Sequence, residues 1–265
     1  MKLLKYICLL CGISGATGSG LPERPVDSDA VRTATVGPHS ELIPKAQARL
    51  MKLASGVENE EISQILSLQE DWSTNMTPEI LELMVMIQLW GKYSAIIQSM
   101  YHQLAALNLD TRLEVTIAPL DYQFTDMATP YTHSEEWYKA LCNESGVMVL
   151  FEHNADKLAG IVRKFEITEK NGKKYCIAEV IADGALLKKL LAASLEGTGS
   201  QPPRCFEQLL TRFGISTGTF FSEKPTIDEQ GVMIPGVLGE VSICQHPICT
   251  VTTGEIQFLE QTGSV

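Results

Sequence analysis

A series of short β-prone segments in the second half of the chain is the feature that most limits its fold. Asn171-Gly172 lies between two of these segments, and such a pair between apolar runs is a strong signal for a β-hairpin. Helical patterns at 185–195 and 206–212 interrupt the series. Short strands with few helices are typical of a small closed or nearly closed barrel. We expect strands at 113–118, 147–151, 159–168, 174–181, 215–221, 231–234 and 238–244.

The chain before residue 109 has a different pattern. Residues 1–20 resemble a short hydrophobic leader or secretory signal, and 21–44 form a Pro-rich linker. A helical region follows at 45–108, and apolar residues recur at helical spacing within 77–107. This apolar stripe either packs against the rest of the chain, which we favour, or mediates formation of a homo-oligomer. The expected fold class is therefore α+β: a helical N-terminal region before a mostly antiparallel β-barrel domain at 109–260 with interposed helices.

Composition and cysteine spacing exclude several functions. The formal net charge of −11 over 265 residues argues against direct nucleic-acid binding, which usually needs a basic surface. No apolar run reaches the ~20 residues that span a bilayer. The seven cysteines are scattered, and Cys244 and Cys249 around His246 lack a second ligand pair. We therefore expect no metal and no other cofactor, and free thiols in a reducing compartment.

Ser216 is a candidate nucleophile, because it lies between two glycines in the β-prone run 213–220. A serine hydroxyl needs a base to take its proton and a third group to orient that base. His153, which follows the apolar run 147–151, is the candidate base, and Glu240 is the candidate acid. Each residue alone would be ordinary as a capped strand-end histidine, a turn serine or a solvated carboxylate.

The Gly-x-Ser-x-Gly pattern also matches the nucleophile elbow of α/β-hydrolases, which would indicate an esterase. That elbow requires a strand before the serine and a helix after it. Here the residues before Ser216 favour a helix and the residues after it favour a strand. The elbow interpretation is therefore the less favoured one.

Three segments together resemble the prohead (capsid maturation) protease family of tailed bacteriophages, which is related in fold to the herpesvirus assembly proteases. The first segment is the apolar strand that ends at His153, with the Gly-Ile-Val-Arg strand at 160–163 after it. The second is Gly214-Ile215-Ser216-Thr217-Gly218, and the third is Glu240-Val241-Ser242-Ile243-Cys244 followed by Pro247. The resemblance covers about residues 110–258.

This resemblance implies a serine endopeptidase with Ser216 as nucleophile, His153 as general base and Glu240 as the orienting acid. His246 is an alternative third member, because the herpesvirus relatives use a second histidine in that role. Capsid and scaffold proteins would be the substrates, self-cleavage would occur, and the protein would act in the host cytoplasm within the immature capsid. Backbone amides near Thr217 or Gly218, or the side chain of Arg163, are candidate oxyanion donors.

Two functions of other classes stay open. If residues 1–20 are a true signal peptide, the protein is exported and could be a noncatalytic binding or adaptor protein. A catalytically inactive assembly scaffold would keep self-association through the helix at 77–107 without proteolysis.

Overall fold

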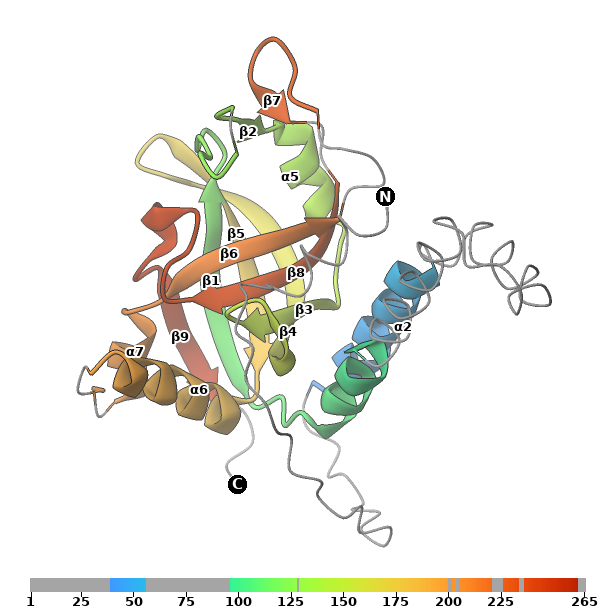
Figure 1. Cartoon of the computed structure of the whole chain (residues 1–265), viewed down its shortest axis with the longest axis vertical. Coiled ribbons are helices and arrows are strands. Elements are labelled where there is room, and N and C mark those ends of the chain that lie inside the picture. The colour runs from blue at the N-terminus through green and yellow to red at the C-terminus, as the bar shows by residue number, and fades with distance from the viewer. Residues whose placement is uncertain are drawn as a thin grey trace, which may run out of the picture.

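The computed structural model of this chain describes residues 39–55, 96–127, 129–199, 202–203, 205–220, 226–233 and 236–261 (Figure 1). The leader expected at 1–20, most of the linker and the first part of the helix expected at 77–107 lie outside the described residues. Residues 96–106 are helical. The other helices are α2 (Leu42–Ser55), α5 (Glu135–Leu141), α6 (Gly184–Gly197) and α7 (Phe206–Leu210), with a 3₁₀ turn, η2, at Thr250–Thr252.

A seven-stranded sheet forms the body of the protein, in the order β6-β8-β3-β4-β5-β1-β9. All neighbouring strands in this sheet are antiparallel except β3 and β8, which run parallel to each other. Strands β1 and β6 also contact each other although they are not paired, so the sheet curls into a half-barrel (Figure 1). The strands are β1 (Thr111–Pro119), β3 (Val147–Phe151), β4 (Asn154–Lys170), β5 (Lys173–Ala182), β6 (Gly214–Phe220), β8 (Val237–Cys244) and β9 (Ile256–Gln261).

The α+β class and the curled, mostly antiparallel sheet agree with the sequence prediction. The Asn171-Gly172 hairpin is confirmed: both residues have positive φ, 54° and 74°, and they connect β4 to β5. The segment expected at 231–234 pairs outside the main sheet, as β7 (Val232–Met233) beside β2 (Thr132–His133). The sequence did not predict β2, α5 or β9.

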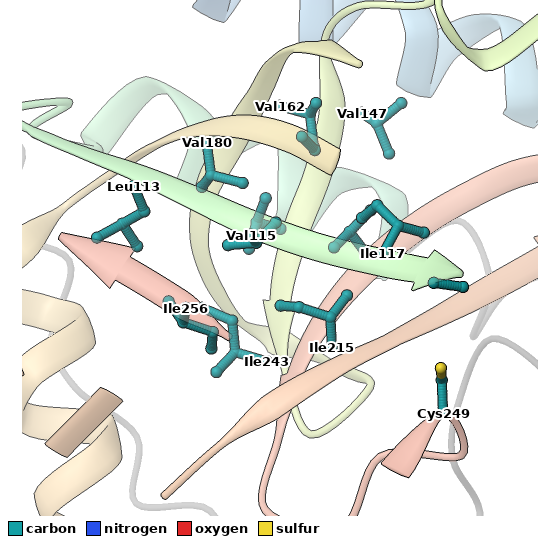
Figure 2. Close-up of a cluster of buried hydrophobic side chains, with 14 of the residues drawn as sticks. Leu113, Val115, Ile117, Val147, Val162, Val180, Ile215, Ile243, Cys249 and Ile256 are labelled. Carbon is teal, nitrogen blue, oxygen red and sulfur yellow. The ribbon is translucent and has the colours of Figure 1, made fainter. Parts of the chain in front are cut away.

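Alternate residues of the strands fill the concave side of the sheet. Figure 2 shows side chains from β1 and from the strands around it pointing toward a common centre. This arrangement follows from the period of two along a strand, which places every second side chain on the same face. The inner core includes Leu113, Val115, Ile117, Val147, Val162, Val180, Ile215, Ile243 and Ile256.

The convex side of β3, β4 and β5 is covered by α2 and the helical residues 96–106 (Figure 1). Because the sheet is buried on both faces here, all five residues of β3 are buried. Met100 of the apolar stripe belongs to this outer core, so the described part of the stripe packs within the chain. Helix α2 begins at Leu42, inside the range expected to be linker. The outer core comprises Leu42, Ala46, Leu50, Met100, Leu104, Leu109, Met148, Leu150, Leu158, Ile161 and Ile181.

Candidate active site

The structure brings His153 and Glu240 together from positions 87 residues apart. Nδ1 of His153 lies 2.6 Å from Oε1 of Glu240. The glutamate side chain is 5% exposed and the histidine side chain 30% exposed. Because an ionised carboxylate can only accept hydrogen bonds, the proton of a neutral His153 is on Nδ1. Nε2, the basic nitrogen, takes part in no hydrogen bond among the described residues.

The backbone around His153 is in an unusual conformation. Glu152 and His153 form the two-residue turn between β3 and β4, and both have φ of 53°. The other tight hairpin of this sheet places Asn171 and Gly172 in the same region, where such residues are favoured. A non-glycine residue in this left-handed region costs roughly 1–2 kcal/mol. Strained residues of this kind cluster at functional sites, which marks the Glu152-His153 turn as a candidate site.

Strand β8 holds the strained turn in place. The amide of Glu152 donates to the carbonyl of Ile243 (3.0 Å), and its carboxylate accepts from the amide of Gln245 (2.7 Å). The amide of His153 donates to Oγ of Ser242 (3.1 Å), whose hydroxyl donates to Oε2 of Glu240 (2.6 Å). Both carboxylate oxygens of Glu240 therefore have partners, which satisfies its buried charge.

Burial and the two carboxylates act on the pKa of His153 in opposite directions. Burial lowers the pKa of His153 and is the largest single effect. The hydrogen bond and charge of Glu240, together with the charge of Glu152, outweigh burial and raise the pKa of His153 above its ordinary value. A raised pKa favours the imidazolium that a general base forms when it takes a proton.

Both glycines of the Gly-x-Ser-x-Gly motif are required by close contacts. A Cβ at Gly218 would lie 2.2 Å from Oε1 of Glu240, because the glutamate side chain crosses this glycine. A Cβ at Gly214 would lie 2.7 Å from both Pro247 and Oγ1 of Thr252. The glycine two residues after the serine thus makes room for the carboxylate that binds His153.

Ser216 lies within β6, directly opposite Ser242 of β8. Residues paired in this way have Cβ atoms roughly 4.5–5.5 Å apart. Glu240 and Ser242 pair with Met148 and Leu150, which face the outer core, so Ser216 shares the convex face with Glu240. The Ser216 hydroxyl is buried and has no hydrogen-bond partner in the described part of the chain. The serine is therefore beside the His153–Glu240 network but is not bonded to it.

Among the described residues, the alternative residues make no hydrogen bond or ion pair with this network. His246 is exposed after β8, and its side chain forms no ion pair or hydrogen bond with the residues the structure describes. Arg163 is on β4, three strands from β6, which is roughly 14 Å at the usual strand spacing. Its guanidinium binds Glu179 at 2.9 Å. Arg163 therefore does not lie where an oxyanion donor for Ser216 is needed.

The position of Ser216 also bears on the elbow interpretation. Ser216 is the third residue of the seven-residue strand β6, and helix α7 precedes this strand. A nucleophile elbow places its serine at a strand-to-helix turn. The structure thus lacks the local geometry of that elbow at Ser216.

A cavity of about 300 Å³ adjoins β6, and the sequence did not predict it. Its lining includes Ser216, Thr217 and Thr219 of β6 and the aromatic side chains Phe124, Tyr131 and His133. Burial lowers the pKa of His133 from 6.5 to about 4, so this imidazole is neutral at pH 7. The dense aromatic sequence of residues 122–138 is the signal that could have indicated such a pocket.

The described residues contain no cluster of three or more His, Cys, Asp or Glu side chains that could hold a metal ion. In the same part of the chain, no helix has the length and apolar character needed to cross a membrane. Comparison of the chain with protein-family models and with curated protein sequences gives no significant match to either.

Proposed function

We propose that this protein is a serine endopeptidase with Ser216 as nucleophile, His153 as general base and Glu240 as the group that orients the base. The observation that carries the proposal is the 2.6 Å contact between His153 and a buried Glu240, made through a strained turn. A structural two-residue hairpin takes the same left-handed conformation but favours Asn and Gly there, and it needs no buried carboxylate bonded to an imidazole.

In the proposed reaction, Ser216 attacks the peptide carbonyl while Nε2 of His153 accepts the hydroxyl proton. Glu240 holds the Nδ1 proton and stabilises the imidazolium that forms. His153 then returns the proton to the leaving amine, and water releases the acyl group from Ser216. The amides of Ser216 and Gly218 are directed at β8, so the amide of Thr217 is the nearest one free to face a carbonyl oxygen.

Ser216 must become accessible before it can act, because the residue is only 4% exposed. Its hydroxyl also has to approach Nε2 of His153, and catalytic hydrogen bonds often form only when substrate is bound. The isolated chain should therefore have low activity that rises when assembly or substrate opens the convex face. Capsid and scaffold proteins are the proposed substrates on the basis of the sequence resemblance, with self-cleavage as the first event.

The test is labelling with a fluorophosphonate probe, followed over a range of protein concentrations by intact-protein and peptide mass spectrometry. We expect one covalent adduct on Ser216, and slow truncation of the parent chain at high concentration. Ser216→Ala and His153→Ala should each abolish both results, since loss of either group lowers the rate roughly 10⁴- to 10⁶-fold. Ser194→Ala, on α6, whose buried residues pack in the inner core, is the control and should behave as the parent.

Absence of the adduct and of truncation at every concentration, also with capsid and scaffold proteins added, would contradict the proposal. In that case the buried, unbonded hydroxyl of Ser216 would favour an inactive scaffold or binding protein. Labelling that persists in Ser216→Ala would place the nucleophile elsewhere.

A further inference from the structure

One edge of the main sheet offers unpaired backbone groups next to Ser216. Ser216 pairs with Ser242, and Ile215 directs its amide away from β8 to Oγ1 of Thr252 (2.8 Å). Because the pairing is unbroken from Gly214 to Gly218, the backbone of Thr217 is directed the same way as that of Ile215. Since β6 is an edge strand, this side of Thr217 faces no partner strand, and the described residues supply no hydrogen bond to its N–H or C=O from outside the strand ladders.

The cavity opens beside this edge. Thr217 and Thr219 lie on the same wall, together with Ile215, which belongs to the inner core. The rest of the lining is mostly aromatic, and Met233, Ile248 and Cys249 make it more apolar. A volume of about 300 Å³ is at the lower end of the range of ligand pockets, roughly 300–1,000 Å³. The cavity is therefore suited to one large side chain rather than to a whole cofactor.

The polar groups of the cavity restrict what can enter it. His133 is 7% exposed, lines the cavity and has a buried Nδ1 with no hydrogen-bond partner in the described part of the chain. Asp126 is an exposed carboxylate in the lining. A neutral imidazole cannot compensate a buried charge, and Asp126 repels a negative one. An uncharged aromatic or large aliphatic side chain is the group that matches these walls.

We propose that the open edge of β6 binds a polypeptide as an added β-strand, with one large uncharged apolar or aromatic side chain of that polypeptide in the adjoining cavity. Strand addition of this kind takes its affinity from main-chain hydrogen bonds and its specificity from pockets for alternate side chains. The interpretation of this edge of β6 as a substrate site rests on the proposed endopeptidase function. Binding of the polypeptide itself does not require catalysis.

The register follows from the pleat of the strand. The residue paired with Thr217 projects to the same face as the Thr217 side chain, which lines the cavity. Its neighbours in the added strand project to the convex face, where the Ser216 side chain lies. The peptide carbonyl that accepts from the Thr217 amide is thus held beside Ser216, and the cavity selects the residue at that point.

The experiment uses the full chain with Ser216→Ala, so that binding is measured without cleavage. The probes are fluorescently labelled, end-blocked nine-residue peptides of Ala, Ser and Thr with Tyr, Leu, Gly, Asp or Lys at the centre. We expect the Tyr and Leu peptides to bind at least tenfold more tightly than the Gly, Asp and Lys peptides in fluorescence anisotropy. Equal binding of all five, or no binding of any, would overturn the proposal.

Two pairs of variants in the same background test the edge and the cavity separately. Thr217→Pro removes the free amide, and proline is tolerated where an edge strand faces outward. It should weaken binding of the Tyr peptide at least tenfold, whereas Thr217→Val keeps the amide and should not. Asp126→Lys should improve binding of the Asp peptide severalfold, and Asp121→Lys, outside the cavity lining, should leave it unchanged. Circular dichroism establishes that each variant is folded.

The outcomes separate this proposal from the proposed function. Selective binding to the Ser216→Ala chain without any Ser216 labelling of the parent would retain the strand site and remove the endopeptidase. Labelling and cleavage that ignore the central residue would retain the endopeptidase and remove the strand site. If they also tolerate Thr217→Pro, the Thr217 amide is not the oxyanion donor.

Discussion

Replacing Gly218 by alanine should destabilise the protein through one contact, that between the new Cβ and the Glu240 carboxylate. The Cβ would lie 2.2 Å from Oε1 and 3.0 Å from the carboxyl carbon, so the glutamate side chain has to move away. Overpacking of this kind typically costs about 1–3 kcal/mol. Movement of Oε1 also breaks its hydrogen bond to His153, and a bond to a charged group contributes about 1.5–3 kcal/mol.

The two costs overlap, because the movement that relieves the clash is the one that breaks the bond. We therefore expect Gly218→Ala to lower the free energy of unfolding by about 2–4 kcal/mol, measured by urea denaturation. Gly197→Ala is the control, since nothing lies within 4 Å of a Cβ at the end of α6. It should be neutral or slightly stabilising, because alanine is preferred to glycine in a helix.

A double-mutant cycle with Glu240→Ala isolates the proposed contact. In the Glu240→Ala background the obstructing carboxylate is absent, so Gly218→Ala should cost less than about 1 kcal/mol. The reasoning is refuted if Gly218→Ala is equally destabilising in both backgrounds, or if it is as mild as Gly197→Ala in the parent.

Three further predictions concern titration and buried hydrogen bonds. Glu240→Gln should lower the pKa of His153, which NMR can follow. In the parent, the raised pKa adds stability that is fully present below about pH 6.5 and is lost as pH rises through the folded-state pKa. The variant should therefore lose most of its free energy of unfolding, relative to the parent, at low pH. The pH dependence of stability due to the buried His133 runs in the opposite direction. Its pKa of about 4 gives stability that is present above pH 6.5 and is lost as pH falls, at roughly 1.4 kcal/mol per pH unit. Urea denaturation of His133→Phe should not show this loss at low pH. Thr252→Val should lower the free energy of unfolding by about 1–3 kcal/mol, because the amide of Ile215 loses its 2.8 Å partner, whereas Thr252→Ser should keep most of the stability.

The strands with strong local signals could be predicted from sequence. All five residues of β3 are buried, and a short continuous apolar run such as 147–151 is typical of a strand covered on both faces. Asn171-Gly172 determined its hairpin because these residues favour positive φ. Strand β9 was missed because Ile256 is its only buried residue among a largely polar sequence, and its pairing with β1 supplies the order.

The candidate site was predictable as residues but not as geometry. His153 and Glu240 were named from sequence, yet their contact depends on β3 and β8 being neighbours, which only the fold determines. The strained turn was not predictable, since Glu152-His153 is not a sequence that favours two positive φ angles. The need for Gly218 likewise depends on a glutamate from another strand that crosses it.

The place of β8 between β3 and β6 has a consequence for folding. Strands β3 and β4 form a hairpin from nearby residues, so the Glu152-His153 turn can begin to form early. Glu240 and the ladder that holds Ser216 both arrive with β8, which pairs with β3 only after a long chain segment has closed. A partly folded chain without β8 therefore has the histidine but neither its carboxylate nor the adjoining serine. We therefore expect the three groups to come together only when β8 pairs, so that a chain in which this strand is still unpaired lacks the site.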